Sequence, residues 1–153
     1  MKTHEEQEVV VERELTIDAR PETVWEFLVD PELAVRWMGT SAELDPRPGG
    51  AFRVKVRDYT ACGEFVEVDP PRRLVWTWGW EPEGMSPLAP GSTTVEVELE
   101  PEGSGTRLRF RHHGFANAAE AGRHEEGWAH YLDRLAVVAK GDDPGADTWR
   151  PGA

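Results

Sequence analysis

Short segments in which apolar and polar residues alternate recur along this chain of 153 residues. Alternation with a period of two is typical of strands that are buried on one face and exposed on the other. In residues 9–17, for example, Val11, Leu15 and Ile17 fall on one face. The alternation predicts strands over residues 9–17, 51–57, 62–69, 72–80, 93–100 and 106–113. The Gly-rich residues 101–105 predict a hairpin turn between the last two.

Proline and capping residues indicate two short helices after the first strand. Pro21 fits the first turn of a helix, and Glu22 is favourable near the positive N-terminal end of the helix. Asp30-Pro31 ends that helix and begins another, because Asp caps helices and Pro fits the first helical position.

A longer helix is predicted near the end of the chain. Asn117 followed by Glu120 resembles a capping box, which marks a helix N-terminus. Apolar residues then recur at spacings of three, four and seven: Ala121, Trp128, Leu132, Leu135 and Val138. The inner face of an antiparallel sheet is the only large surface for this stripe to cover. We therefore predict an α+β fold, in which a curved antiparallel sheet wraps around a long C-terminal helix.

The chain length corresponds to one typical domain, which we place at residues 9–140. Residues 1–8 are polar and acidic, and we expect a disordered N-terminus there. Residues 141–153 are rich in Gly, Pro and Asp, and we expect a flexible C-terminal tail.

The net charge of −12, from 17 basic and 29 acidic side chains, bears on the partners and the location of the protein. A negative surface repels phosphate backbones and anionic lipids, so neither nucleic acid nor a membrane is an expected partner. No segment approaches the roughly 20 apolar residues of a membrane span. The polar N-terminus lacks the apolar core of a signal peptide, and we expect a cytoplasmic protein. Cys62 is the single cysteine, which excludes an internal disulfide framework and a cysteine-based metal cluster.

Two neighbouring strands carry opposite charges on their expected outer faces: Glu96, Glu98 and Glu100 on one, and Arg107, Arg109 and Arg111 on the other. Such cross-strand pairs support strand pairing by about 0.2–1 kcal/mol each. We interpret these residues as a solvated ladder of ion pairs rather than a ligand site.

The most informative run of the chain is Leu74-Val75-Trp76-Thr77-Trp78-Gly79-Trp80. At strand period, Trp76, Trp78 and Trp80 share one face with Leu74, whereas Thr77 points outward. These tryptophans either fill the core or form the wall of a pocket, and both interpretations can hold at different ends of the strand. As a wall, they would favour flat or greasy ligands. The candidate lining residues are Trp25, Trp37, Phe52, Trp76, Trp78, Phe110, His112, Trp128 and Leu132.

The histidines of the chain are candidates for catalytic or metal-binding roles. His112 alternates with Leu108 and Phe110, which places it on the inner face as a polar anchor. His124 and His130 are six residues apart on the last helix, about 600° around its axis, so they cannot share a metal ion. The chain contains no GxSxG, HExxH, GxGxxG or P-loop motif. We expect no metal, no cofactor and no catalytic residues.

A series of motifs resembles a known family. The motifs are Val24-Trp25, Asp30-Pro31-Glu32, Trp37, Gly49-Gly50, Gly63, residues 67–74, Thr77-Trp78, Thr106, His113-Gly114-Phe115 and Gly127-Trp128. Their order and spacing resemble the family of homologues of the activator of heat-shock-protein ATPase, within the START-like (SRPBCC) superfamily. This resemblance implies a helix-grip fold with an internal cavity for hydrophobic ligands. Members of the superfamily range from lipid carriers to cyclases and chaperone partners.

Three functions remain open at this point, and binding of a small hydrophobic or aromatic molecule in the cavity is favoured. The second is an enzyme of the cyclase, dehydratase or hydrolase kind that works in the same cavity. The third is a module that interacts with a chaperone ATPase, as the family name suggests. The composition also leaves a homodimer open.

Overall fold

The computed structural model describes residues 9–81 and 88–148. Its elements, in chain order, are β1 (Val10–Ile17), α1 (Pro21–Val29), α2 (Pro31–Ala34), β2 (Ser41–Leu44), β3 (Ala51–Val56), β4 (Tyr59–Asp69), β5 (Arg73–Glu81), β6 (Thr93–Glu102), β7 (Gly105–His113) and α3 (Ala118–Ala139). All the predicted strands and helices are present, with ends that differ by a few residues. The short strand β2 was not predicted, because its four residues contain only two apolar side chains.

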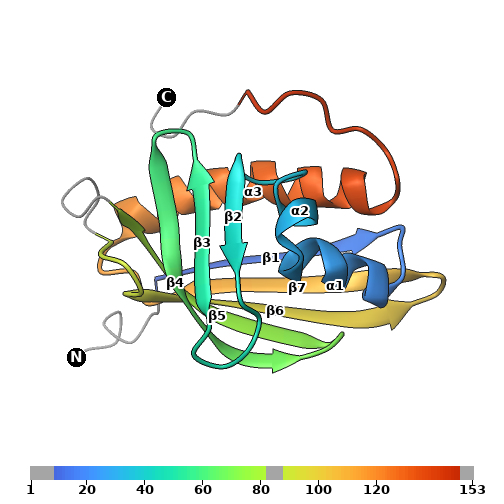
Figure 1. Ribbon diagram of the computed structural model, residues 1–153, viewed down its shortest axis with the longest axis horizontal. Coiled ribbons are helices and arrows are strands. Elements are labelled where there is room, and N and C mark those ends of the chain that lie inside the picture. The colour runs from blue at the N-terminus through green and yellow to red at the C-terminus, as the bar shows by residue number, and fades with distance from the viewer. Residues whose placement is uncertain (1–8, 82–87, 149–153) are drawn as a thin grey trace, which may run out of the picture.

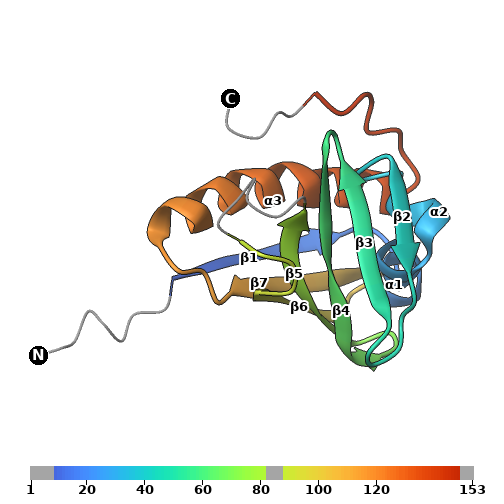
Figure 2. The same ribbon diagram turned by 60° about the vertical axis from the view of Figure 1, so that its left-hand side comes forward.

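The strands within the described ranges form one antiparallel sheet in the order β1-β7-β6-β5-β4-β3-β2, so that β1 and β2 lie at its edges. Strands β2, β3 and β4 turn away from the direction of β1, β6 and β7, and α3 lies along the concave side (Figures 1 and 2). Helices α1 and α2 lie beside the C-terminal half of α3 (Figure 1). The predicted α+β helix-grip fold is confirmed.

Capping residues begin α2 and α3 where the sequence predicted. The Asp30 carboxylate accepts a hydrogen bond from the backbone N–H of Glu32, 2.9 Å away, at the start of α2. At the start of α3, Asn117 Oδ1 accepts from the backbone N–H of Glu120, also at 2.9 Å. The second half of the expected capping box is absent, because the buried Glu120 carboxylate pairs with Arg123 instead.

The expected disorder of residues 1–8 lies outside the described residues, as do residues 149–153 of the expected tail. The flexibility of the tail remains a prediction. In its described part, the Asp147 carboxylate accepts hydrogen bonds from Tyr131 Oη at 2.6 Å and pairs with His130 Nε2 at 2.8 Å. Asp147 thus joins this part of the chain to α3.

Candidate functional site

The face pattern predicted for β5 is confirmed. Leu74, Trp76 and Trp78 are at most 3% exposed and point toward the core. Thr77 is on the opposite face, where its hydroxyl accepts a hydrogen bond from the backbone N–H of Glu64, 2.9 Å away. The strict alternation of this strand therefore supplies two neighbouring indoles to the inside of the molecule.

The interior next to β5 is filled by aromatic rings from four elements. The Phe52 ring of β3 stacks on Trp76, with ring centroids 5.1 Å apart. The Trp128 ring of α3 lies between two strands, 4.9 Å from Trp78 and 4.5 Å from Phe110. We call this set, Phe52, Trp76, Trp78, Phe110, His112 and Trp128, the aromatic cluster. The prediction that Trp128 lies across from Trp78 is confirmed.

His112 is the polar centre of the aromatic cluster and is completely buried. Its Nδ1 accepts a hydrogen bond from Trp128 Nε1 at 3.0 Å. Since an indole N–H only donates, the proton of the neutral ring is on Nε2. Nε2 therefore donates to the Thr93 hydroxyl at 2.8 Å, and this hydroxyl donates to the Trp78 carbonyl oxygen at 2.8 Å. A continuous series of hydrogen bonds thus runs from Trp128 on α3 through His112 and Thr93 to the Trp78 carbonyl on β5.

His124 extends the cluster toward the N-terminal end of α3. Its ring is 5.4 Å from that of His112 and 5.2 Å from that of Phe115. His124 Nε2 accepts from Trp80 Nε1 at 2.9 Å, and Nδ1 donates to the backbone carbonyl of Glu120 at 2.8 Å. His124 thus satisfies a backbone carbonyl of its own helix as well as an indole of β5. Its place beside the cluster was missed, although it precedes Trp128 by one helical turn.

Burial sets the protonation state of both histidines. Desolvation lowers the pKa of His112 well below the ordinary value of 6.5, and the nearby His124 and His113 lower it further. Desolvation also lowers the pKa of His124, against the opposing effect of its hydrogen bond to the Glu120 carbonyl. Both rings are therefore neutral at neutral pH, and all four ring nitrogens are already hydrogen-bonded.

The nine predicted lining residues are all buried, but the structure brings only some of them together. Leu132 lies one turn after Trp128 on α3 and is 2% exposed. Trp37 is near the other end of the grip, where its Nε1 donates to the Phe27 carbonyl at 2.9 Å and its own carbonyl accepts from Arg134 at 3.1 Å. Trp25, on α1, makes no ring contact with the aromatic cluster among the described residues. Strand and helix periodicity predicts that a side chain is inside, but not in which part of the interior it lies.

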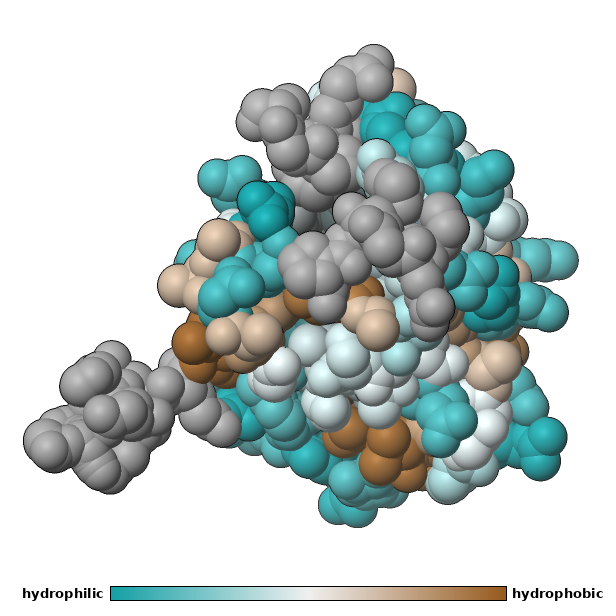
Figure 3. Space-filling view, turned by 90° about the vertical axis from the view of Figure 1, so that its left-hand side faces the viewer, coloured by the Kyte–Doolittle hydropathy of each residue, from teal (hydrophilic) through white to brown (hydrophobic). Residues whose placement is uncertain are grey.

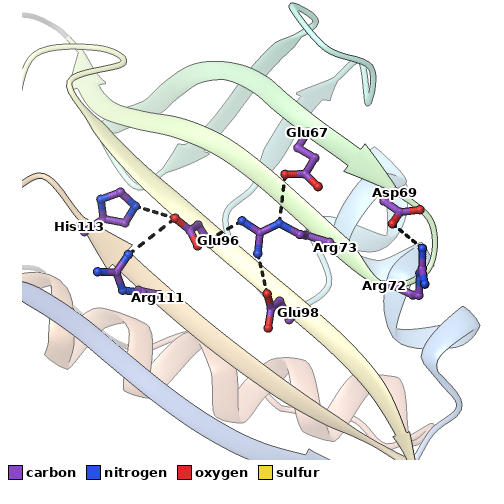
Figure 4. A network of polar contacts seen from close by, with 8 residues as sticks. All are labelled: Glu67, Asp69, Arg72, Arg73, Glu96, Glu98, Arg111 and His113. Carbon is purple, nitrogen blue, oxygen red and sulfur yellow. Dashed lines mark hydrogen bonds and ion pairs between the residues drawn. The ribbon is translucent and has the colours of Figure 1, made fainter.

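The outer face of the sheet carries the predicted ladder of ion pairs. Glu96 pairs with Arg111 across β6 and β7 at 3.7 Å, and Glu100 with Arg109 at 3.5 Å. Arg73 and His113 extend the network, with Arg73 reaching Glu98 at 2.6 Å (Figure 4). Partial burial favours a higher pKa for Glu96, but the His113 hydrogen bond and nearby charges outweigh it and hold the pKa below its ordinary value. The acidic and basic groups neutralise each other, as the sequence analysis expected.

Residues 18–140 match the family described as Activator of Hsp90 ATPase homolog 1-like protein. The chain belongs to this family. No curated protein matches it.

Solved structures agree with the family assignment. An AHSA1-like protein from Rhizobium etli is 44% identical, with 92% of this chain and 88% of that chain covered and a TM-score of 0.71. The Aha1 dimer from Colwellia psychrerythraea is 17% identical, covering 86% of this chain and 96% of that one at a TM-score of 0.74. An HSP90 activator from Plasmodium falciparum is 22% identical, covering 84% and 94% at a TM-score of 0.69. The last two show the shared fold alone.

Two further observations concern metals and membranes. Among residues 9–81 and 88–148, no group of three or more His, Cys, Asp or Glu side chains is placed to hold a metal ion. None of the helices described here has the length and apolar character needed to cross a membrane.

Proposed function

We propose that this AHSA1-like domain binds a small, flat, apolar molecule between the sheet and the N-terminal half of α3. The observation that carries the proposal is the aromatic cluster, an interior of mostly apolar rings in which Trp78 of β5 and Trp128 of α3 lie 4.9 Å apart and would have to separate around a ligand. Sites for small molecules are lined mainly by apolar and aromatic side chains with a few polar groups, which is the composition of this cluster. The superfamily resemblance supports the same class of ligand.

The polar groups at the cluster favour carriage over catalysis. A proton-transfer catalyst needs a nitrogen or oxygen that is free to meet the substrate. His112 and His124 converge, which is the observation that favours an enzyme. Each of them, however, uses both ring nitrogens within the protein, so a catalytic role would require one of these hydrogen bonds to open.

Native mass spectrometry of the freshly purified protein tests the proposal. We expect a retained small molecule that is released on denaturation, and the same spectrum counts the subunits. The proposal is wrong if the protein carries nothing and its tryptophan fluorescence does not change during titration with fluorene, a flat hydrocarbon.

Substitution of His112 by Ala separates carriage from catalysis once a ligand is known. For a carrier, binding weakens by about 1–3 kcal/mol, because the Trp128 N–H in the wall of the site loses its acceptor. For an enzyme, turnover falls by about 100-fold or more with little change in affinity. Binding and turnover measured on the same preparation distinguish the two.

A chaperone ATPase is the second candidate partner, suggested by the family name and by the Plasmodium falciparum relative. A protein partner favours a broad exposed apolar patch. Among residues 9–81 and 88–148, Val66 is the only large hydrophobic side chain that is exposed. The face shown in Figure 3 has small, separate hydrophobic areas between polar ones. A change in the ATPase rate of an Hsp90-type chaperone on addition of this protein would support the second candidate.

A further inference from the structure

Residues 141–148 turn back from the end of α3 and reach the turn between β3 and β4 (Figures 1 and 2). At that point Asp147 contacts two elements at once. Its carboxylate accepts hydrogen bonds from Tyr131 Oη at 2.6 Å and from His130 Nε2 at 2.8 Å, both on α3. Its backbone carbonyl accepts from the Arg57 guanidinium, in the β3–β4 turn, at 2.8 Å. Asp147 therefore links the hairpin to the helix.

A second arginine, Arg134 of α3, holds the same segment. It donates to the backbone carbonyls of Gly145 at 3.0 Å and Pro144 at 3.4 Å. Its Nε donates to the Trp37 carbonyl at 3.1 Å, which fixes the guanidinium in place. Each hydrogen bond described between residues 144–147 and the rest of the domain is thus donated by the domain. We call the four donating residues, Arg57, His130, Tyr131 and Arg134, the donor site.

The donor site has the chemistry of a carboxylate-binding site. Arginine side chains are always charged, and they bind carboxylates and carbonyl oxygens as donors only. Tyr131 is 4% exposed, and a buried hydroxyl needs an acceptor. Burial and the hydrogen bond to Asp147 raise the pKa of Tyr131, whereas the positive charges of Arg57 and Arg134 oppose this rise. Both guanidinium groups therefore lie close enough to the Tyr131 hydroxyl to attract an anion there.

Arg57 occupies a backbone position that favours glycine. It is the first of the two residues between β3 and β4, and its φ of +60° is rare for any residue with a side chain. Glycine, asparagine and aspartate are the usual residues with positive φ in such turns. The guanidinium of Arg57 instead extends to the backbone of Asp147. Strained residues of this kind concentrate at functional sites, which favours a role for Arg57 beyond the turn.

The segment that fills the donor site is attached loosely. Gly145 and Ala146 are exposed, and Pro144 and Asp147 are only half-buried. Gly141 and Gly145 have positive φ values of 102° and 77°, and a Cβ at either position would meet no atom within 4 Å. The chain can pivot at both glycines without disturbing packed side chains. A segment with so little buried surface opens at low cost, so a competing segment can take its place.

We propose that the donor site recognises an acidic peptide segment of a partner protein, and that residues 144–147 occupy it as an internal ligand until the partner displaces them. This interaction surface goes beyond the proposed function and includes no residue of the aromatic cluster. Charge complementarity supports it, because the site gathers two arginines in a chain whose net charge is −12.

A second copy of the chain is a less suitable partner. Exchange of segments between two copies would replace each contact with an identical one, and it would add the entropic cost of association. It would also bring together two chains that each carry a net charge of −12. A partner whose segment carries several acidic residues gains attraction from both arginines that the internal segment, with one carboxylate in the site, does not use.

A peptide titration followed by ¹H–¹⁵N NMR tests the proposal. The probe is a synthetic peptide with the sequence of residues 141–148, Gly-Asp-Asp-Pro-Gly-Ala-Asp-Thr, with both ends blocked. The receptor is the full-length variant Asp147→Ala, whose internal ligand lacks the carboxylate. We expect the backbone signals of the donor site to shift. The peptide should bind this variant about 10-fold or more tightly than the native protein, because the tethered native segment competes at a high effective concentration.

Two peptide variants that lose the same charge provide the matched comparison. Asp147→Asn in the peptide should weaken binding about 10-fold or more, since it removes the charged acceptor of the donor site. Asp142→Asn in the peptide should change binding by less than about two-fold, because Asp142 pairs with Lys140 at the protein surface rather than with the donor site.

Receptor variants assign the binding to the donor site. Added to Asp147→Ala, Tyr131→Phe should weaken peptide binding about 10-fold, whereas Arg13→Gln on the distant strand β1 should leave it unchanged. Should the Tyr131 variant not fold, Arg57→Gly replaces it as the test. Glycine suits the positive φ of this turn, so Arg57→Gly should weaken peptide binding without lowering the melting temperature.

Four outcomes overturn the proposal. If the peptide shifts no donor-site signal in Asp147→Ala, the residues do not form a separate site. Equal binding to Asp147→Ala and to the native protein shows that residues 144–147 are not an internal ligand. Equal binding of the native and Asp147→Asn peptides shows that the carboxylate is not recognised. A native dimer in sedimentation that is lost in Asp147→Ala assigns the site to segment exchange between copies instead of a partner protein.

Discussion

His112 should make the stability of this protein depend on pH in a range where few other groups titrate. The perturbation is His112→Gln, which keeps one donor and one acceptor side by side but cannot be protonated. In the folded protein, desolvation lowers the pKa of His112 well below its ordinary 6.5, whereas in the unfolded chain the ring is free to take a proton. Below pH 6.5, the unfolded state therefore binds more protons than the folded state. The part of the free energy of unfolding that depends on a neutral His112 is fully present above this pH. It is lost as the pH decreases toward the pKa of His112 in the folded protein.

The magnitude follows from the linkage relation. Between about pH 7.5 and about pH 5.5, a histidine that stays neutral in the fold and titrates normally when unfolded removes about 1.4 kcal/mol from the free energy of unfolding. His124 has a lowered pKa and adds a loss of the same sign. The lowered pKa of Glu96 acts in the same direction but below its ordinary value of 4.5, outside this range.

Urea unfolding at the two pH values provides the measurement. The native sequence should lose about 1.4 kcal/mol more than His112→Gln between them, whatever the absolute stability of the variant. As a control, Gln in place of the exposed Lys140 should leave the loss between the two pH values the same as in the native protein. Equal pH-dependent losses in the native protein and in His112→Gln would show that His112 is not held neutral by burial.

Three further predictions concern packing and polar contacts. Trp128→Phe should be less stable than Trp78→Phe by about 1–3 kcal/mol in urea unfolding, because it leaves His112 Nδ1 without its donor; equal stabilities would contradict the assigned tautomer. Gly127→Ala should lower the free energy of unfolding by about 1–3 kcal/mol, since Gly127 is buried on α3 and overpacking of a close contact costs about that much; a gain in stability would contradict close packing at Gly127. Asp147→Asn should let Tyr131 ionise at lower pH in an absorbance titration, because burial and the Asp147 hydrogen bond both raise the pKa of Tyr131.

Much of the fold follows from periodicity, because each strand and helix has one face that must leave water. The alternation in β5 predicted that Trp76 and Trp78 point inward and Thr77 outward, and the structure agrees. The Asn117 cap was predictable from the local pairing of one side chain with a backbone N–H. The edge strand β2 was not, because only two of its residues are apolar and its pairing depends on β3.

The candidate site was less predictable, since it depends on which rings meet across the interior. Trp37 has the same burial as Trp78, yet it bonds to Phe27 near the far end of the grip. The partners of the indole N–H groups depend on side-chain rotamers, which no periodicity contains. The position of His124 beside the aromatic cluster could have been predicted from the sequence, because it lies one turn before Trp128 and therefore on the same face of α3.

The edges of the sheet affect how this protein behaves at high concentration. An open strand edge invites a strand of another chain, and long, flat, apolar edges lead to fibrils. Here one edge, β1, carries the charged Glu12, Arg13 and Glu14, and the other, β2, has only four residues. The net charge of −12 adds repulsion between copies. Copies of this chain should therefore resist edge-to-edge aggregation, and a dimer is expected to form through a surface other than the strand edges.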